Sequence, residues 1–245
     1  MQRRVLALVA LLLALAGCGG GGGASSGATA SLWVTRDGGA RVMLNTSVQA
    51  GTSVLQALDR KADIETRYGG RFVQSIDGVE GDLGKRRDWF FFGNGIEPGL
   101  GAAEVNLRPG DVAWWDHRSW AARMAEPVVV GAFPEPFVHG WQGRRRPVEL
   151  RLPAGLAEDA PALRLPLGGP GGSGEPNVFE VVIDEAADGA TLVARRGAAD
   201  GSPVSFTLTG TERATGGALD ALLRDPTIVR YRYTARFDDG GEVVR

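Results

Sequence analysis

The sequence predicts an α+β protein built from two consecutive domains, and three observations support this. The composition, 43% hydrophobic and 23% charged, is that of a globular protein. In the first half, two strand patterns precede a helix pattern and further strand patterns follow. In the second half, short strand patterns surround a single helix pattern. We place the first domain at residues 31–125 and a second α+β domain, lower in helix content and similar to no family we recognise, at 126–245.

The amino terminus predicts export and lipid attachment. Arg3 and Arg4 precede an apolar run over residues 5–16, and small residues then lead to Cys18, the single cysteine of the chain. This order is typical of a secretory signal peptide, and the run is shorter than the about 20 residues that span a bilayer. We therefore predict a lipoprotein signal peptide at 1–17 and lipidation of Cys18, whose context resembles the bacterial lipobox. An ordinary cleaved signal with a chance cysteine is the alternative.

The segment after Cys18 indicates where the protein is located, and the overall charge limits the classes of binding partner. Residues 18–30 are rich in Gly and Ser and predict a flexible tether. The protein would thus be anchored by lipid at the extracytoplasmic face of the cell membrane. A net charge of −2 argues against nucleic acid as a partner. The Arg run at 144–146 is interpreted as a solvated loop, with an anion site as the alternative.

The first domain is expected to begin with a hairpin and a capped helix. Residues 31–44 predict two short strands around the Gly38-Gly39 turn. Ser53 and Gln56 have the spacing of a capping box, and apolar residues then recur at helical spacing until the pattern fades near residue 63.

Strands are expected to complete this domain. Residues 71–79 predict a strand and turn, and 89–92 predict a strand closed by Asn94-Gly95, a dipeptide that suits tight turns. The return strand is placed at 103–107 and the last strand at 112–116.

Four segments carry a resemblance to a known family: residues 52–58, 73–79, 89–95 and 108–114. Together they resemble the transcobalamin-like C-terminal domain, a family that includes the C-terminal β-domain of intrinsic factor and many bacterial lipoproteins. The resemblance implies a β-grasp (ubiquitin-like) fold for the first domain. It also implies cobalamin or another corrinoid as a possible ligand, because this domain covers one face of cobalamin in the animal members.

The second domain is predicted from strand and helix patterns alone. Residues 127–133 predict a buried strand, and 227–237 alternate as a strand with one buried and one solvated face. A short helix is expected at 218–224 after Gly216-Gly217. Other strands are expected at 148–152, 179–183, 191–195 and 204–208.

No catalytic set stands out, and we predict that the protein is not an enzyme. The chain has two histidines and one cysteine, too few for a site with several His ligands to a metal. Asp116 and His117 are adjacent near three tryptophans. His117 is interpreted as a surface residue at a strand end, with a ligand-facing position as the alternative.

Tryptophans are the better functional indication, since five of the six lie between residues 89 and 141. Trp114 and Trp115 are adjacent in a strand and must point to opposite faces. Either one face binds a ligand, or the second domain covers it. The predicted ligand-contact residues are Trp89, Phe91, Asn94, Gly95, Trp114, Trp115, Asp116 and Trp120.

Together these observations predict a membrane-anchored lipoprotein that binds a small ligand, with a corrinoid as the first candidate, and delivers it to a membrane transporter. No cofactor is assigned beyond that ligand. The alternative function is a protein-interaction or envelope-structural module, such as an accessory subunit of a membrane complex.

Overall fold

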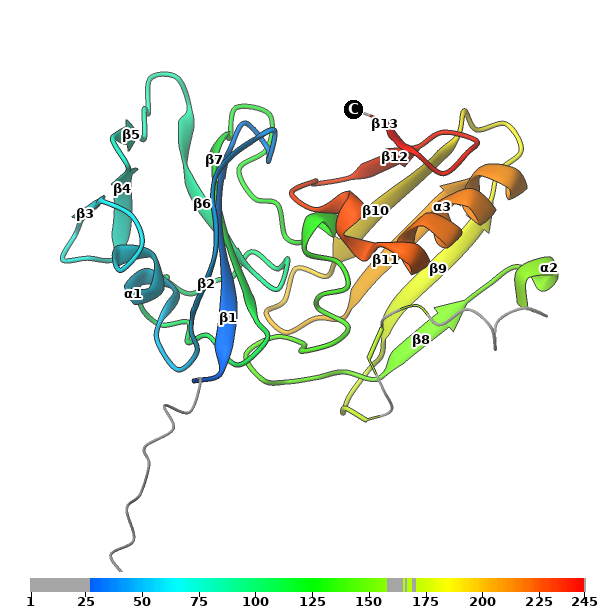
Figure 1. Cartoon of the computed structure of the whole chain (residues 1–245), viewed down its shortest axis with the longest axis horizontal. Helices are drawn as coiled ribbons and strands as arrows, with labels where there is room; N and C mark the ends of the chain where they lie inside the picture. The colour runs from blue at the N-terminus through cyan, green and yellow to red at the C-terminus, as the bar shows by residue number, and fades with distance from the viewer. Residues whose placement is uncertain (1–26, 158–164, 166, 169–170, 245) are drawn as a thin grey trace, which may run out of the picture.

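The computed structural model describes residues 27–157, 165, 167–168 and 171–244 (Figure 1). The predicted signal peptide, Cys18 and most of the predicted tether lie outside the described residues. Among the helices described, none is both long and apolar enough to cross a membrane.

The first domain is organised around a mixed sheet with the strand order β2-β1-β7-β6. Its strands are β1 (Thr29–Arg36), β2 (Arg41–Gln49), β6 (Arg87–Gly93) and β7 (Val112–Ser119). The outer pairs β1–β2 and β6–β7 are antiparallel, whereas the central pair β1–β7 is parallel. The predicted hairpin is confirmed, and Gly38 and Gly39 form its turn with φ of 68° and 83°.

Helix α1 (Val54–Asp59) packs on one face of this sheet. The predicted capping box is present, because Ser53 Oγ accepts from Gln56 N at 3.1 Å and Gln56 Oε1 accepts from Ser53 N at 3.2 Å. The helix ends earlier than expected. A smaller sheet of order β3-β4-β5 follows, formed by β3 (Ile64–Arg67), β4 (Phe72–Ile76) and β5 (Val79–Glu80).

The return strand predicted at 103–107 is wrong, because β6 pairs with β7 instead. Residues 102–107 form a loop whose backbone caps the start of α1. The carbonyl of Val105 accepts from Val54 N, and Leu107 N donates to the carbonyl of Thr52, both at 2.9 Å. Val105 and Leu107 are buried by this contact, which explains their apolar character.

The second domain is built on a six-stranded sheet of order β13-β12-β10-β11-β9-β8. The strands are β8 (Val148–Arg151), β9 (Asn177–Ile183), β10 (Ala190–Arg196), β11 (Val204–Gly210), β12 (Ala235–Phe237) and β13 (Val243–Val244). Helix α3 (Glu212–Arg224) lies across one face, and the short α2 (Ala154–Ala157) follows β8 (Figure 1). Helix α3 begins before Gly216-Gly217, because Thr211 caps it by accepting from Ala214 N at 3.1 Å.

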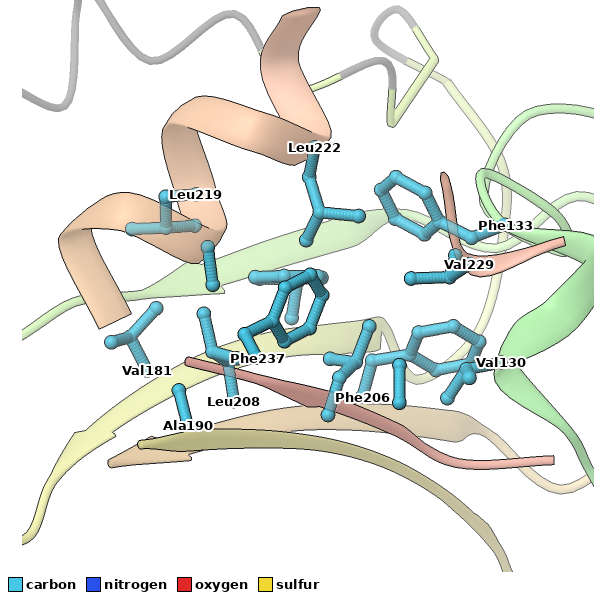
Figure 2. Close-up of a cluster of buried hydrophobic side chains, with 14 of the residues drawn as sticks. Val130, Phe133, Val181, Ala190, Phe206, Leu208, Leu219, Leu222, Val229 and Phe237 are labelled. Atoms are coloured by element: carbon cyan, nitrogen blue, oxygen red, sulfur yellow. The ribbon is translucent and has the colours of Figure 1, made fainter. Parts of the chain in front are cut away.

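The main core of the second domain lies between α3 and its sheet. Figure 2 shows Leu219 and Leu222 of α3 above Phe206 and Leu208 of β11, with Phe237 of β12 between them. Two 3₁₀ turns, η1 (Val130–Ala132) and η2 (Pro226–Val229), close one end of this core.

The strands predicted at 127–133 and 227–237 are therefore wrong in part. Residues 130–132 and 226–229 form 3₁₀ turns, and only Ala235–Phe237 of the second range is a strand. Tyr231 has a φ of 65°, which breaks the extended chain. The two segments bond to each other, since Val130 N donates to the carbonyl of Tyr233 and Tyr231 N to that of Gly131, both at 3.3 Å.

A third core joins the two domains. Trp33, Phe92 and Trp114, on the face of the first sheet opposite α1, pack against Tyr231 and Tyr233 of the second domain. Gly131 permits this close approach, because a Cβ there would lie 2.5 Å from Arg232 N and 2.9 Å from Trp114. The second domain thus covers the face that carries Trp114. The α+β prediction is confirmed at the level of a strand-rich protein with few helices.

Candidate ligand site

The predicted aromatic contact residues lie inside the protein. Trp89 and Trp115 are buried in the core under α1, where Phe91 stacks on Trp115 at 5.0 Å between ring centroids. Trp114 is fully buried on the opposite face, and its Nε1 donates to Thr35 Oγ1 at 2.7 Å. These aromatic residues are thus divided between two cores. In the structure they do not form a common ligand surface.

The polar groups of the Asn94-Gly95 turn also form hydrogen bonds within the protein. Asn94 Nδ2 donates to Asp111 Oδ1 and to the carbonyl of Gly140, both at 2.8 Å, and Asn94 Oδ1 accepts from Val112 N at 2.7 Å. The carbonyl of Gly95 accepts from Val129 N at 2.9 Å. The expected ligand bonds at this turn are therefore replaced by bonds that fix β6, β7 and the second domain together.

Asp116 is fully buried and forms a polar link between the domains. Its Oδ1 accepts from Thr35 Oγ1 at 2.7 Å and Gly39 N at 3.2 Å, and its Oδ2 accepts from Gly38 N at 3.1 Å and Tyr233 OH at 2.8 Å. Burial, followed by the Asp116 charge, raises the pKa of Tyr233 and keeps its hydroxyl a donor. Asp116 is thus a structural residue. Trp120 is half-buried beyond β7, where its backbone N–H donates to the carbonyl of Arg86 at 2.9 Å.

A different part of the first domain carries an open hollow of about 890 Å³. It lies between the small β3-β4-β5 sheet, the loop at 81–86 and the ends of β1 and β7. The floor and walls combine aromatic, cationic and acidic side chains. The lining includes Arg36, Arg67, Tyr68, Phe72, Leu83 and His117.

His117 lines this hollow and is 4% exposed, so the interpretation as a surface histidine is wrong. Its Nε2 lies 3.1 Å from the carbonyl of Glu80, which fits an Nε2–H donor, and its ring packs against Trp89. Burial, and then the charge of Arg87, lowers the pKa of His117 and keeps the imidazole neutral. Nδ1 has no hydrogen-bond partner among the residues described.

Charged groups surround the imidazole. Arg36 lies beside His117 in the β1–β7 register, and its Nε lacks a partner within the described part of the chain. Arg87 pairs with Asp37 and donates to the carbonyl of His117 at 3.1 Å. Asp88 is buried, and burial raises the pKa of its carboxyl. The hollow therefore offers cationic groups and a neutral imidazole beside a carboxyl that is more readily protonated than usual.

The rim of the hollow is apolar and exposed. Tyr68 is 81% exposed and Leu83 is 75% exposed, and they are among the most exposed large hydrophobic residues described. The Tyr68 ring contacts Phe72 edge-on at 6.4 Å. Exposed apolar groups beside a hollow mark binding sites for ligands or partners. The arrangement can hold a ligand with an apolar face and a negatively charged or hydrogen-bonding group.

Sequence reasoning missed this hollow because its residues come from separate strands brought together by pairing. The one local signal was that Tyr68 and Leu83 are large apolar residues within glycine-rich turn segments. No group of three or more His, Cys, Asp or Glu that could hold a metal ion occurs in the described ranges.

The first domain matches a known family in part. Residues 51–119 match the family described as Domain of unknown function (DUF4430), a segment that includes every residue lining the hollow except Arg36. No curated protein matches the chain.

Two solved structures are similar to parts of the chain, both with low TM-scores. One is a proposed metal binding protein from Ruminococcus gnavus ATCC 29149, with 16% identity, a TM-score of 0.32, and coverage of 38% of this chain and 97% of that chain. The other is haptocorrin in complex with Cbi, with 18% identity and a TM-score of 0.30. That match covers 37% of this chain and 25% of the haptocorrin chain. The chain therefore spans only about a quarter of the length of haptocorrin.

Proposed function

We propose that this protein is a non-enzymatic lipoprotein, anchored at the extracytoplasmic face of the membrane, that binds a small ligand in the hollow of its first domain. The observation that carries the proposal is the combination of an exposed apolar rim at Tyr68 and Leu83 with buried polar atoms of His117 and Arg36 that lack partners in the described structure. The volume of about 890 Å³ falls within the range typical of small-molecule sites.

A corrinoid is the first ligand to test. The support is the resemblance of four segments to the transcobalamin-like family, which also motivates the proposal of a β-grasp fold for the first domain. A sheet in which parallel β1 and β7 are central and α1 packs on one face fits that fold. Delivery of the ligand to a membrane transporter would follow from the anchored location.

Equilibrium titration of the full chain in mild detergent with a corrinoid panel tests the ligand. Tryptophan fluorescence should change saturably on binding, because Trp89 lies directly behind His117, and calorimetry provides a second measurement. Leu83→Ala should weaken binding, whereas Leu100→Ala, also exposed but outside the hollow, should not. An absence of binding at high micromolar corrinoid would exclude this ligand class.

Detergent phase partitioning tests the anchor. The wild-type protein should enter the detergent phase, whereas a chain that begins at Ser25, and so lacks both the apolar signal and the acyl acceptor Cys18, should remain in the aqueous phase. Equal partitioning of both proteins would contradict lipidation of Cys18.

The interaction-module alternative is favoured by the same exposed rim, which could contact a protein partner. In that case Tyr68→Ala and Leu83→Ala would disrupt a membrane complex in pull-down experiments while no small molecule binds the purified chain.

A further inference from the structure

A second hollow, of about 350 Å³, is lined mainly by residues of the second domain, together with Ile96 from the loop between β6 and β7. It is bounded by Trp141, the segment at 173–174 and the ends of β10 and β11. Its lining residues include Arg144, Arg146 and Arg196, whereas Asp200 is the only acidic residue among the described residues that line it. Two of these arginines belong to the run at 144–146 for which the sequence left an anion site open.

Arg196 is the central feature, because its side chain is buried and no carboxylate of the described residues accepts a hydrogen bond from it, although the charges of Asp200 and Glu97 lie near it. Its side chain is 7% exposed, and the nearest carboxylate oxygen, Asp200 Oδ1, is 3.6 Å from Nη2. This distance is longer than that of a protein hydrogen bond. Nε and Nη1 have no hydrogen-bond partner in the described ranges. A buried cation in this state is costly unless a partner of opposite charge approaches it.

The other two arginines do not supply that partner and add to the positive potential. Arg146 donates from Nη1 to the carbonyl of Glu175 at 2.7 Å and from Nη2 to that of Gly201. These bonds orient the guanidinium but leave its charge uncompensated. Arg144 is exposed, and no carboxylate of the described residues lies within 4.0 Å of it or of Arg146.

The remaining lining indicates what the anion is attached to. Trp141, Ile96 and Pro136 form an apolar wall, and Ser173 and Ser202 contribute hydroxyl groups. The volume is at the lower end of the range for small-molecule sites, which excludes a large ligand. We propose that this hollow binds a small organic oxyanion, a carboxylate or phosphate group on a compact apolar body. The arginines hold the oxygens, and the body rests against Trp141.

Titration of the full chain in mild detergent with phenyl phosphate, benzoate and inorganic phosphate tests this site. Calorimetry and tryptophan fluorescence should show saturable binding of phenyl phosphate or benzoate that weakens as salt is added. Tighter binding of phenyl phosphate assigns a phosphate ligand, and tighter binding of benzoate assigns a carboxylate. Inorganic phosphate should bind more weakly than phenyl phosphate, because it lacks an apolar body. Benzyl alcohol is the neutral control, and equal binding of this compound would overturn the proposal.

Two variants and a matched control locate the site. Arg144→Gln and Arg196→Gln should each weaken anion binding by about tenfold, since charge-assisted hydrogen bonds to the oxyanion are lost. Arg151→Gln, at an exposed position of β8 outside the hollow, should bind as the wild type does. Thermal unfolding in anion-free buffer shows whether Arg196→Gln is folded, and Arg144→Gln serves if it is not. Anion affinity unchanged in Arg144→Gln and in folded Arg196→Gln overturns the proposal. This site shares no lining residue with the first hollow, so its test is independent of the corrinoid titration.

Discussion

Removing the hydroxyl group of Tyr233 should lower the free energy of unfolding by about 2 kcal/mol. The hydroxyl donates to Asp116 Oδ2 at 2.8 Å, and hydrogen bonds to charged groups contribute about 1.5–3 kcal/mol. Asp116 keeps its bonds from Thr35 and the two glycine amides, so the carboxylate is not left without donors. In Tyr233→Phe the ring remains packed on Phe92 and Trp114, so the lost bond is the main change.

Urea unfolding followed by tryptophan fluorescence measures this loss directly. For a protein of this size, about 2 kcal/mol corresponds to a fall of roughly 4–8 °C in the midpoint of thermal unfolding. Tyr231→Phe is the matched control. Its ring contacts Trp33 and Trp114 in the same core, but its hydroxyl makes no bond to Asp116. The control should lose no more than about 0.5 kcal/mol, as for changes away from key contacts.

Two results would refute the reasoning about the junction. One is equal destabilisation in Tyr233→Phe and Tyr231→Phe, which would assign the effect to ring packing and not to Asp116. The other is additivity with Thr35→Val, because residues that share one carboxylate should show an interaction energy of about 0.5–3 kcal/mol in a double-mutant cycle.

Three further predictions concern the Asn94-Gly95 turn, the main core of the second domain and the buried His117. Asn94 has a φ of 50° and makes three internal bonds. Both Asn94→Ala and Asn94→Gly lose these bonds, but Asn94→Ala should be less stable than Asn94→Gly by about 1 kcal/mol in urea unfolding, because glycine adopts this conformation with less strain than alanine; equal stabilities would show that the positive φ carries no strain at this turn. Phe206→Ala should cost about 3–5 kcal/mol in the same assay, since Phe206 is fully buried against Phe133 and Phe137, and a loss below about 1 kcal/mol would mean that the core collapses to fill the cavity. Burial lowers the pKa of His117 below its ordinary value of 6.5, so the unfolded chain takes up a proton first as the pH falls. The contribution of neutral His117 to the free energy of unfolding is complete above pH 6.5 and is lost as the pH falls below 6.5. The stability difference between wild type and His117→Gln should change in that range, and a difference that is constant with pH would contradict a lowered pKa.

Local signals in the sequence predicted local structure well. The capping box at Ser53 and Gln56 and the Gly38-Gly39 hairpin depend on groups within a few residues of each other, and both occur in the structure. The strands at 177–183, 190–196 and 204–210 also lie where alternation predicts them. These elements are determined by capping, turn and periodicity rules that act over one element at a time.

Features that depend on distant partners were not predictable in this way. Residues 227–237 alternate as a strand would, yet Tyr231 and Tyr233 use their side chains to cover the first sheet. The first hollow was missed for the same reason, because Arg36 and Tyr68 meet His117 only through strand pairing. The predicted aromatic contact residues do not form one ligand surface, because adjacent residues on a strand pack into two different cores. Periodicity shows that Trp114 and Trp115 point to opposite faces, but it does not show whether either face is exposed.

The contact between the Trp114 face and Tyr233 has a consequence for how the chain is made. Asp116 and Tyr233, which bond across the junction, are separated by 117 residues. At synthesis rates of about 5–20 residues per second, Tyr233 is added roughly 6–23 s after Asp116. During that interval the first domain has Trp33, Phe92 and Trp114 without their cover. Any chain whose second domain has not yet folded therefore exposes these aromatic side chains, and conditions that delay folding of the second domain should increase aggregation even though the finished molecule buries them.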